Sequence, residues 1–114
     1  MSDCLFCKIV AGEVSSTKIF EDDELFAFED INPQAPVHVL IIPKKHIETL
    51  NDVTPEDSPM IGRMLHRAAQ IAREQGTAEA GYRTTFNVNK GGGQLVYHIH
   101  LHVLGGKQLK SSLG

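Results

Sequence analysis

The fold is decided by the stretch Tyr97-His98-Ile99-His100-Leu101-His102-Val103. Polar and apolar residues alternate along it, which is typical of a β-strand that buries one face. We therefore expect a strand over 97–104, with the three histidines on one side and the aliphatic residues pointing into a core. Imidazole changes charge near neutral pH and can act as nucleophile, general acid or metal ligand, so this row is a candidate reactive site.

The remaining patterns predict a single α+β domain over residues 1–114. Apolar runs, turn residues and a helical repeat of apolar positions separate the elements. The expected order is a short N-terminal helix (4–10), strands (18–20, 25–28 and 37–42), one main helix from 54–59 to Gly76, and strands (82–88 and 97–104). Two antiparallel hairpins beside one helix form an antiparallel sheet with a helical layer.

Composition narrows the range of partners. The formal net charge is −3 and there is no basic run, so sequence-independent binding to nucleic acid is not expected. No apolar stretch approaches the length of a membrane span, and the N-terminus lacks a signal-peptide pattern. We expect a cytoplasmic protein with no membrane partner.

The histidine row allows three interpretations: unrelated histidines, a metal site, or covalent catalysis by one histidine with its neighbours orienting and protonating. The preceding loop, Lys90-Gly91-Gly92-Gly93-Gln94, favours the third. Glycines let backbone N–H groups approach an anion closely. A phosphate held beside a histidine indicates phosphoryl or nucleotidyl transfer, in which positioning and charge stabilisation dominate.

The segment Gly93–Gly106 resembles the signature of the histidine-triad (HIT) family, and most closely its Hint branch of nucleotide-binding proteins. A second block, Phe28–His46, is similar to the same family, and the resemblance extends from Leu5 to Gly106. It implies a HIT-like α+β fold whose sheet continues across a homodimer. It also implies hydrolysis of purine nucleoside phosphoramidates or related adenylates, AMP-like substrates, to the nucleoside monophosphate, without a catalytic cofactor.

The same resemblance assigns roles to residues. His100 would attack the α-phosphorus and hold a covalent nucleotidyl group, His102 would contact the phosphate and protonate the leaving group, and His98 would orient the array. Asp30 would accept hydrogen bonds from the ribose hydroxyls. The remaining substrate contacts would come from Asn87, Gly93, Gln94 and Leu95 at the phosphate, and from Leu5, Phe6, Ile9, Phe28, Ile31 and Leu40 at the base.

The chain departs from the Hint pattern in two places. Leu95 stands where a hydroxyl residue is common, and the chain ends Lys110-Ser111-Ser112-Leu113-Gly114 instead of in an aromatic residue followed by Pro-Pro-Gly. Three rival functions remain open: a non-catalytic nucleotide-binding regulatory module, a dinucleoside polyphosphate hydrolase, and a metal-storage or metal-sensing protein.

Cys4 and Cys7 form a C-x-x-C pair near the N-terminus. A redox pair, half of a metal site and two small buried thiols are all compatible with this spacing. The resemblance includes the zinc-containing bacterial type of histidine-triad protein, which has cysteines at this place, as do the related galactose-1-phosphate uridylyltransferases, in which two cysteines and two histidines hold zinc. Mapped onto this chain, it implies a structural zinc site formed by Cys4, Cys7, His38 and His98. His46 is expected in a loop, and His66 on the solvated face of the main helix.

Overall fold

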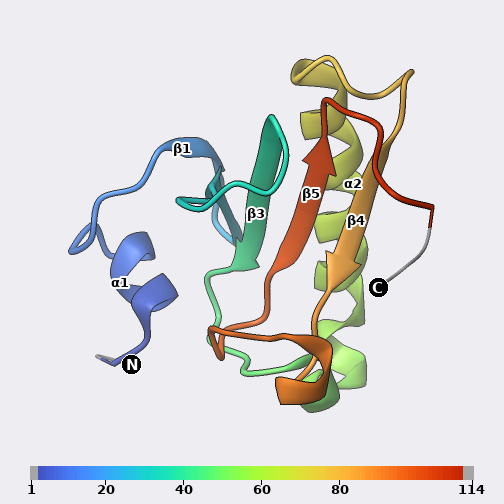
Figure 1. Cartoon of the computed structure of the whole chain (residues 1–114). Coiled ribbons are helices and arrows are strands. Elements are labelled where there is room, and N and C mark those ends of the chain that lie inside the picture. The colour runs from blue at the N-terminus through green and yellow to red at the C-terminus, as the bar shows by residue number, and fades with distance from the viewer. Residues whose placement is uncertain (1–2, 112–114) are drawn as a thin grey trace.

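An antiparallel sheet of five strands runs through residues 3–111, the part of the chain that the computed structural model describes. Its strands are β1 (Lys18–Glu21), β2 (Leu25–Glu29), β3 (Val37–Pro43), β4 (Tyr82–Phe86) and β5 (Leu101–Gly105), in the spatial order β1-β2-β3-β5-β4 (Figure 1). The helices are α1 (Leu5–Val10) and α2 (Ser58–Glu74), with single 3₁₀ turns η1 (Leu50–Asp52), η2 (Pro55–Asp57) and η3 (Lys90–Gly92). The α+β expectation is confirmed.

Helix α2 begins and ends at the residues that the sequence indicated. In the turn η2, which leads directly into the helix, both the N–H and the hydroxyl of Thr54 donate to the Asp57 carboxylate, at 3.0 and 3.1 Å, as in a capping box. At its end, Gly76 has φ +79°, the left-handed conformation that glycine adopts without steric cost. The buried side chains of the helix are Met60, Met64, Ala68, Ile71 and Ala72, so this stripe faces the sheet, and Figure 1 shows the helix behind β4 and β5.

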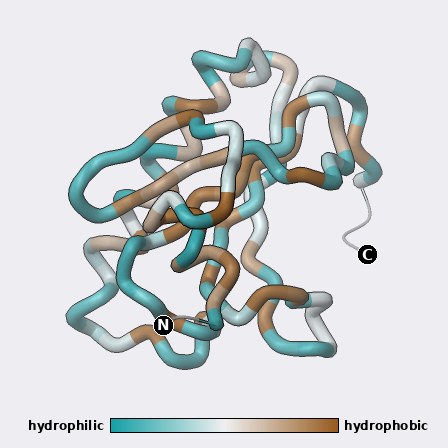
Figure 2. Tube along the Cα trace, turned by 90° about the vertical axis from the view of Figure 1, so that its left-hand side faces the viewer, coloured by the Kyte–Doolittle hydropathy of each residue, from teal (hydrophilic) through white to brown (hydrophobic). Residues whose placement is uncertain are grey.

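Alternation along the strands gives the sheet two apolar faces. The face under α2 forms the main core, built from Leu25, Ala27, Val39, Ile41, Ile99, Leu101, Val103 and residues of the helix. The opposite face packs against α1 and is built from Phe6, Ile9, Phe26, Phe28, Leu40 and Ile42. Figure 2 shows the hydrophobic segments gathered inside and hydrophilic residues along the outer loops. His102 lies opposite Leu40 in the β3–β5 register, so the histidine array belongs to the α1 face.

The histidine strand begins later than predicted, at Leu101 instead of residue 97. The backbone groups before it bond elsewhere. The Ile99 N–H donates to the Ile47 carbonyl at 2.7 Å, and the His98 carbonyl accepts from the His100 ring at 2.8 Å. The predicted alternation is still present, because Ile99, Leu101 and Val103 are all buried in the main core.

No helix among the described residues combines the length and apolar character that crossing a bilayer requires.

Candidate functional site

His100 occupies the centre of the α1 face of the sheet and is 8% exposed. Its Nδ1 lies 2.8 Å from the His98 carbonyl oxygen. A carbonyl only accepts, so Nδ1 carries the hydrogen and Nε2 keeps a free lone pair. Burial lowers the pKa of His100 below its usual value. The ring is therefore neutral at physiological pH and holds the tautomer that a nucleophile needs.

His102 has the opposite tautomer, set by a chain of two hydrogen bonds. The backbone N–H of Gln34 donates to Nδ1 of His38 at 2.9 Å, so the hydrogen of His38 is on Nε2. That N–H donates to Nδ1 of His102, also at 2.9 Å. His102 consequently carries its own hydrogen on Nε2. Its ring centroid is 5.0 Å from that of His100, so a ring with a free lone pair is the neighbour of a ring with an N–H donor.

Burial and crowding keep this array uncharged. Burial, reinforced by His100 and His38, lowers the pKa of His102 to about 4. Burial also lowers the pKa of His38, while the Asp30 carboxylate opposes that shift. Asp30 Oδ2 lies 3.4 Å from His38 Nε2. An anion placed at the array adds a second negative charge and favours protonation there.

Two expected polar contacts lie beside the array. The Asn87 amide nitrogen is 3.5 Å from His102 Nε2; both atoms are donors in the tautomer assigned above, so the two groups are neighbours without a hydrogen bond between them. Asp30 Oδ1 accepts from the Asn32 N–H at 2.8 Å and so stabilises the loop after β2. The Asp30 carboxylate therefore contacts both its own loop and His38, and its expected bond to a ribose stays a prediction.

The glycine-rich loop was predicted to present its backbone N–H groups to an anion, but three of these groups are bonded within the loop. The N–H groups of Gly92, Gly93 and Gln94 all donate to carbonyls within the loop, at 3.0–3.1 Å, so they are not available to an anion. The buried Gln94 side chain donates to the carbonyls of Glu48 and Val96, at 2.7 and 3.0 Å. In the structure Gln94 holds the loop, and the substrate contact expected of this residue stays a prediction.

The residues expected around a base divide into buried and exposed sets. Phe6, Ile9, Phe28 and Leu40 are buried together on the α1 face. The Phe6 ring stands edge-on to His100, with 5.1 Å between centroids. Leu5, Ile31 and Leu95 are 45%, 94% and 90% exposed. The first set forms a wall beside His100, and the second offers apolar surface to solvent.

Two shallow hollows on the surface lie away from the histidines. One is lined by residues 18–23 with Lys44, and the other by charged residues that include Lys45, Asp57 and Arg63. Lys44 and Arg63 are paired there with Glu21 and Glu24. The candidate site is therefore identified by the tautomers and burial of His100, His102 and His38, and not by a surface hollow.

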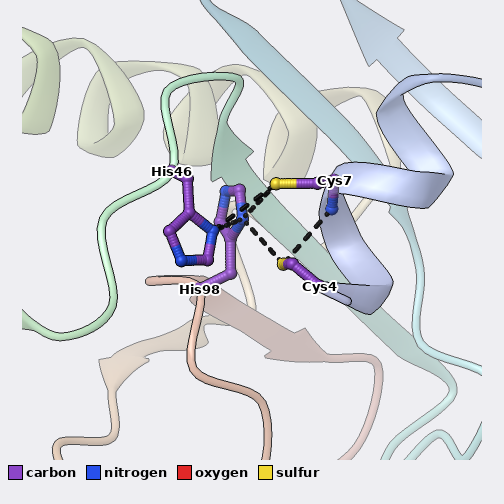
Figure 3. A group of neighbouring side chains, drawn as sticks. All are labelled: Cys4, Cys7, His46 and His98. Atoms are coloured by element: carbon purple, nitrogen blue, oxygen red, sulfur yellow. Dashed lines mark hydrogen bonds between the residues drawn. The ribbon is translucent and has the colours of Figure 1, made fainter. Parts of the chain in front are cut away.

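A second cluster brings together Cys4, Cys7, His46 and His98, which we call the metal cluster (Figure 3). Cys7 comes from α1 and Cys4 from the N-cap of that helix, His46 from the loop after β3, and His98 from the segment before β5. The Nδ1 atoms of the two histidines are 3.3 Å apart. Cys4 Sγ lies 3.3 Å from His98 Nδ1, and Cys7 Sγ lies 3.4 Å from His46 Nδ1 and 3.6 Å from His98 Nδ1.

These distances fit a tetrahedral zinc ion. Zn–N bonds of about 2.0–2.1 Å and Zn–S bonds of about 2.3 Å require edges of about 3.3 Å between nitrogens and about 3.6 Å between nitrogen and sulfur. His98 Nε2 lies 2.7 Å from the Pro43 carbonyl, so Nε2 holds the hydrogen and Nδ1 points a lone pair into the cluster. Burial lowers the pKa of His98 to about 4, which keeps the ring neutral, the form that binds metal.

His46 takes the place predicted for His38 in this cluster, so that part of the predicted ligand set is wrong. The register of β3 with β5 explains why. His38 lies opposite Leu104, and Ile41 lies opposite Leu101. Continued antiparallel, this register leads His98 toward the far end of β3, where His46 follows. His38 joins Asp30 and His102 instead. Of the other histidines, His66 is exposed on α2, as predicted.

An α+β fold with a neutral histidine whose Nε2 is free, next to a histidine that carries an N–H donor, is an arrangement suited to histidine-dependent group transfer. The family model described as scavenger mRNA decapping enzyme C-term binding matches residues 3–114. The chain belongs to the histidine-triad family, and it is a hydrolase. The predicted family is therefore confirmed.

Relatives and solved structures agree with this assignment. The purine nucleoside phosphoramidase of Escherichia coli K12 is 50% identical over 94% of this chain and 90% of its own length. The HIT family hydrolase of Legionella pneumophila is 57% identical, with a TM-score of 0.96 over 98% of this chain and 100% of that one. A Zn-bound histidine triad family protein of Mycobacterium smegmatis is 34% identical, with a TM-score of 0.82 over 96% of this chain and 79% of its own.

Proposed function

We propose that the chain hydrolyses purine nucleoside phosphoramidates or related adenylates to the nucleoside monophosphate through a nucleotidyl group carried on His100. One observation carries the proposal: Nε2 of His100 has a free lone pair on a neutral, buried ring, and the neighbouring His102 ring carries an N–H donor. The phosphoramidase activity of the relative that is 50% identical supports the substrate class.

In the first step, the His100 Nε2 lone pair forms a bond to the α-phosphorus, and the bond from phosphorus to the leaving nitrogen breaks. The negative phosphoryl group favours the protonated form of His102, which takes the additional proton from solvent at Nδ1. The Nε2 proton of that ring then passes to the leaving nitrogen. When His102 is charged, the His38 N–H can turn from it to the Asp30 carboxylate, which lies 3.4 Å away. In the second step the oxygen of a water molecule bonds to phosphorus while the bond from phosphorus to His100 Nε2 breaks, and the water gives a proton to Nε2 of His102, which lost its own in the first step. The products are the monophosphate and a free His100.

The test is turnover of a fluorogenic adenosine phosphoramidate by wild type, His100→Ala and the control His66→Ala, which changes an exposed histidine of α2. We expect His100→Ala to lower kcat by at least about a thousandfold, as loss of a nucleophile does, and His66→Ala to match wild type. Equal turnover by the wild type and His100→Ala would remove His100 from the mechanism. Binding of AMP without turnover by the wild type would indicate a nucleotide-binding module.

We also propose that the metal cluster holds a structural zinc ion. Support comes from the tetrahedral fit of the four donor atoms, from the tautomer of His98, and from the Zn-bound relative. With four protein ligands the coordination sphere is closed, so the ion would supply rigidity and not chemistry. Elemental analysis of the purified protein checks this: we expect one zinc per chain in wild type and a large loss in Cys7→Ser.

We further propose the homodimer and the cytoplasmic location that the sequence suggested. Among the described residues, β1 and β4 are the edge strands of the sheet, and each can extend it by pairing with a second copy. Free thiols that serve as metal ligands fit a reducing compartment. Analytical ultracentrifugation tests the dimer, and a monomer at micromolar concentration would contradict it.

A further inference from the structure

Helix α1 is too short to be stable alone. It has six residues, Leu5–Val10, and isolated helices of this length are marginal in water. Two apolar side chains, Phe6 and Ile9, bury against the sheet. Its other attachment is through the two cysteine sulfurs, which meet His46 and His98 (Figure 3). The position of the helix therefore depends on the metal cluster as well as on apolar contact.

Phe6, one of the two residues between the cysteines, lies beside His100. The Phe6 ring is 5.1 Å from His100 with an interplanar angle of 87°, and 6.0 Å from His98. It also packs edge-on against Phe28, at 5.4 Å. Whatever bonds to His100 must lie beside this ring. A shift of α1 would move Phe6 away and open the nucleophile to solvent.

His98 forms a second link between the cluster and the nucleophile. Its ring contributes Nδ1 to the metal cluster, and its backbone carbonyl accepts the hydrogen bond that fixes the tautomer of His100. The ring is held on its other side by the Pro43 carbonyl at 2.7 Å. One residue thus serves both as a ligand and as the anchor of the catalytic ring.

We infer that the metal cluster controls the reactive site: a metal ion bound by Cys4, Cys7, His46 and His98 seats Phe6 and the His98 carbonyl against His100. Loss of the ion releases α1, uncovers His100 and loosens its alignment. The inference rests on the proposed function for what His100 does, but the seating of α1 can be measured without any substrate. It assigns the ion a role in keeping the nucleophile shielded, beyond holding the fold together.

The competing account is that Phe6 and Ile9 hold α1 unaided. In that case the ion adds global stability and leaves His100 unaffected. The two accounts differ in what happens to α1 while the sheet stays folded. The N–H groups of Lys8 and Ala11 report on the helix, because they donate to the Cys4 and Cys7 carbonyls at 3.0 Å. The amides of β5, residues 101–105, report on the sheet.

The experiment compares zinc-loaded and chelator-stripped wild type by two readouts. The first is hydrogen exchange at Lys8, Ala11 and residues 101–105. The second is carbethoxylation of His100 by diethyl pyrocarbonate, with exposed His66 as the internal reference. On removal of zinc we expect exchange in α1 and modification of His100 to rise by about tenfold or more, since a released segment opens locally. Exchange in β5 and modification of His66 should change by less than about twofold.

Unchanged protection of α1 and unchanged modification of His100 in the stripped protein would overturn the inference. If removal of zinc also raises exchange in β5, the variant His46→Gln provides the deciding measurement. It removes a ligand that lies outside α1 and leaves both cysteines in place. Protection of α1 equal to wild type in this variant contradicts the inference. Phe6→Leu keeps all four ligands, so it should retain zinc and still expose His100. A His100 rate equal to wild type in that variant would refute shielding by Phe6.

Failure of the proposed function is distinguishable from failure of this inference. No phosphoramidate turnover by the zinc-loaded protein, together with zinc-dependent protection of α1 and His100, rejects the function and supports the inference. Turnover that is equal with and without zinc, with α1 protected in both, rejects the inference and supports the function.

Discussion

Replacing His38 by alanine should lower turnover without removing either group that contacts substrate. The buried His38 ring accepts from the Gln34 N–H and donates to His102 Nδ1, both at 2.9 Å. The alanine variant leaves His102 free to adopt either tautomer and a wider range of orientations. Loss of partners that orient a functional histidine typically costs about 10–100-fold. We therefore expect kcat to fall by about tenfold or more, and KM to change less.

The same change should reduce stability. Two hydrogen bonds to the buried His38 ring are lost, while their partners, the exposed Gln34 N–H and the half-buried His102 ring, can reach water. At about 0.5–1.5 kcal/mol for each bond, we expect a loss of about 1–3 kcal/mol in the free energy of unfolding. His38→Gln separates positioning from packing, because its amide can still donate toward His102. We expect the glutamine variant to recover part of kcat.

The assay is steady-state hydrolysis of a fluorogenic phosphoramidate, with urea unfolding on the same samples and His66→Ala as the control. A kcat for His38→Ala within twofold of wild type would refute the relay. So would equal kcat values for His38→Gln and His38→Ala, because a purely structural role predicts no rescue by a hydrogen-bond donor.

Two further predictions concern stability. Gln94→Ala removes three hydrogen bonds that hold the glycine-rich loop, at 2.7–3.0 Å, so urea unfolding should show a loss of about 2–3 kcal/mol, and a loss below about 0.5 kcal/mol would contradict that role. His102 has a pKa of about 4 in the folded protein against about 6.5 unfolded, so its contribution is complete above pH 6.5 and is lost as the pH falls toward 4. Between pH 7.5 and 5.5, wild type should therefore lose about 1.3 kcal/mol more than His102→Gln, and equal losses in urea unfolding would show that the ring is not kept neutral.

Most of the fold could be predicted from local patterns. The capping box of Thr54, the glycine after α2 and the alternation in the histidine segment each depend on residues near in sequence. The strand boundary at residue 97 was wrong because side chains and a distant carbonyl take the backbone groups that a ladder would use. Periodicity reports which face a residue occupies, and it does not report which partner its backbone finds.

Local sequence patterns predicted only part of the metal cluster. The C-x-x-C pair and His98 were identified correctly as neighbours, but the fourth member depended on strand register. His38 lies near the start of β3, and His46 follows the end of that strand. The residues before each histidine are compatible with either a turn or a strand, so they do not distinguish the two as ligands. The pairing of His38 with Leu104 places His98 toward the opposite end of β3, which is the end that His46 follows. Likewise, the internal hydrogen bonds of the glycine-rich loop follow from its three-dimensional closure and could not be read from its composition.

The most direct test of the central claim is mass spectrometry of the protein quenched during turnover of an adenosine phosphoramidate, using His102→Ala to slow release of the intermediate. We expect a mass increase of one adenylyl group, located on the peptide that contains His100 and absent from the His100→Ala, His102→Ala double variant. An adduct on another residue, or hydrolysis with no adduct at any time point, would contradict the assignment of His100 as the nucleophile.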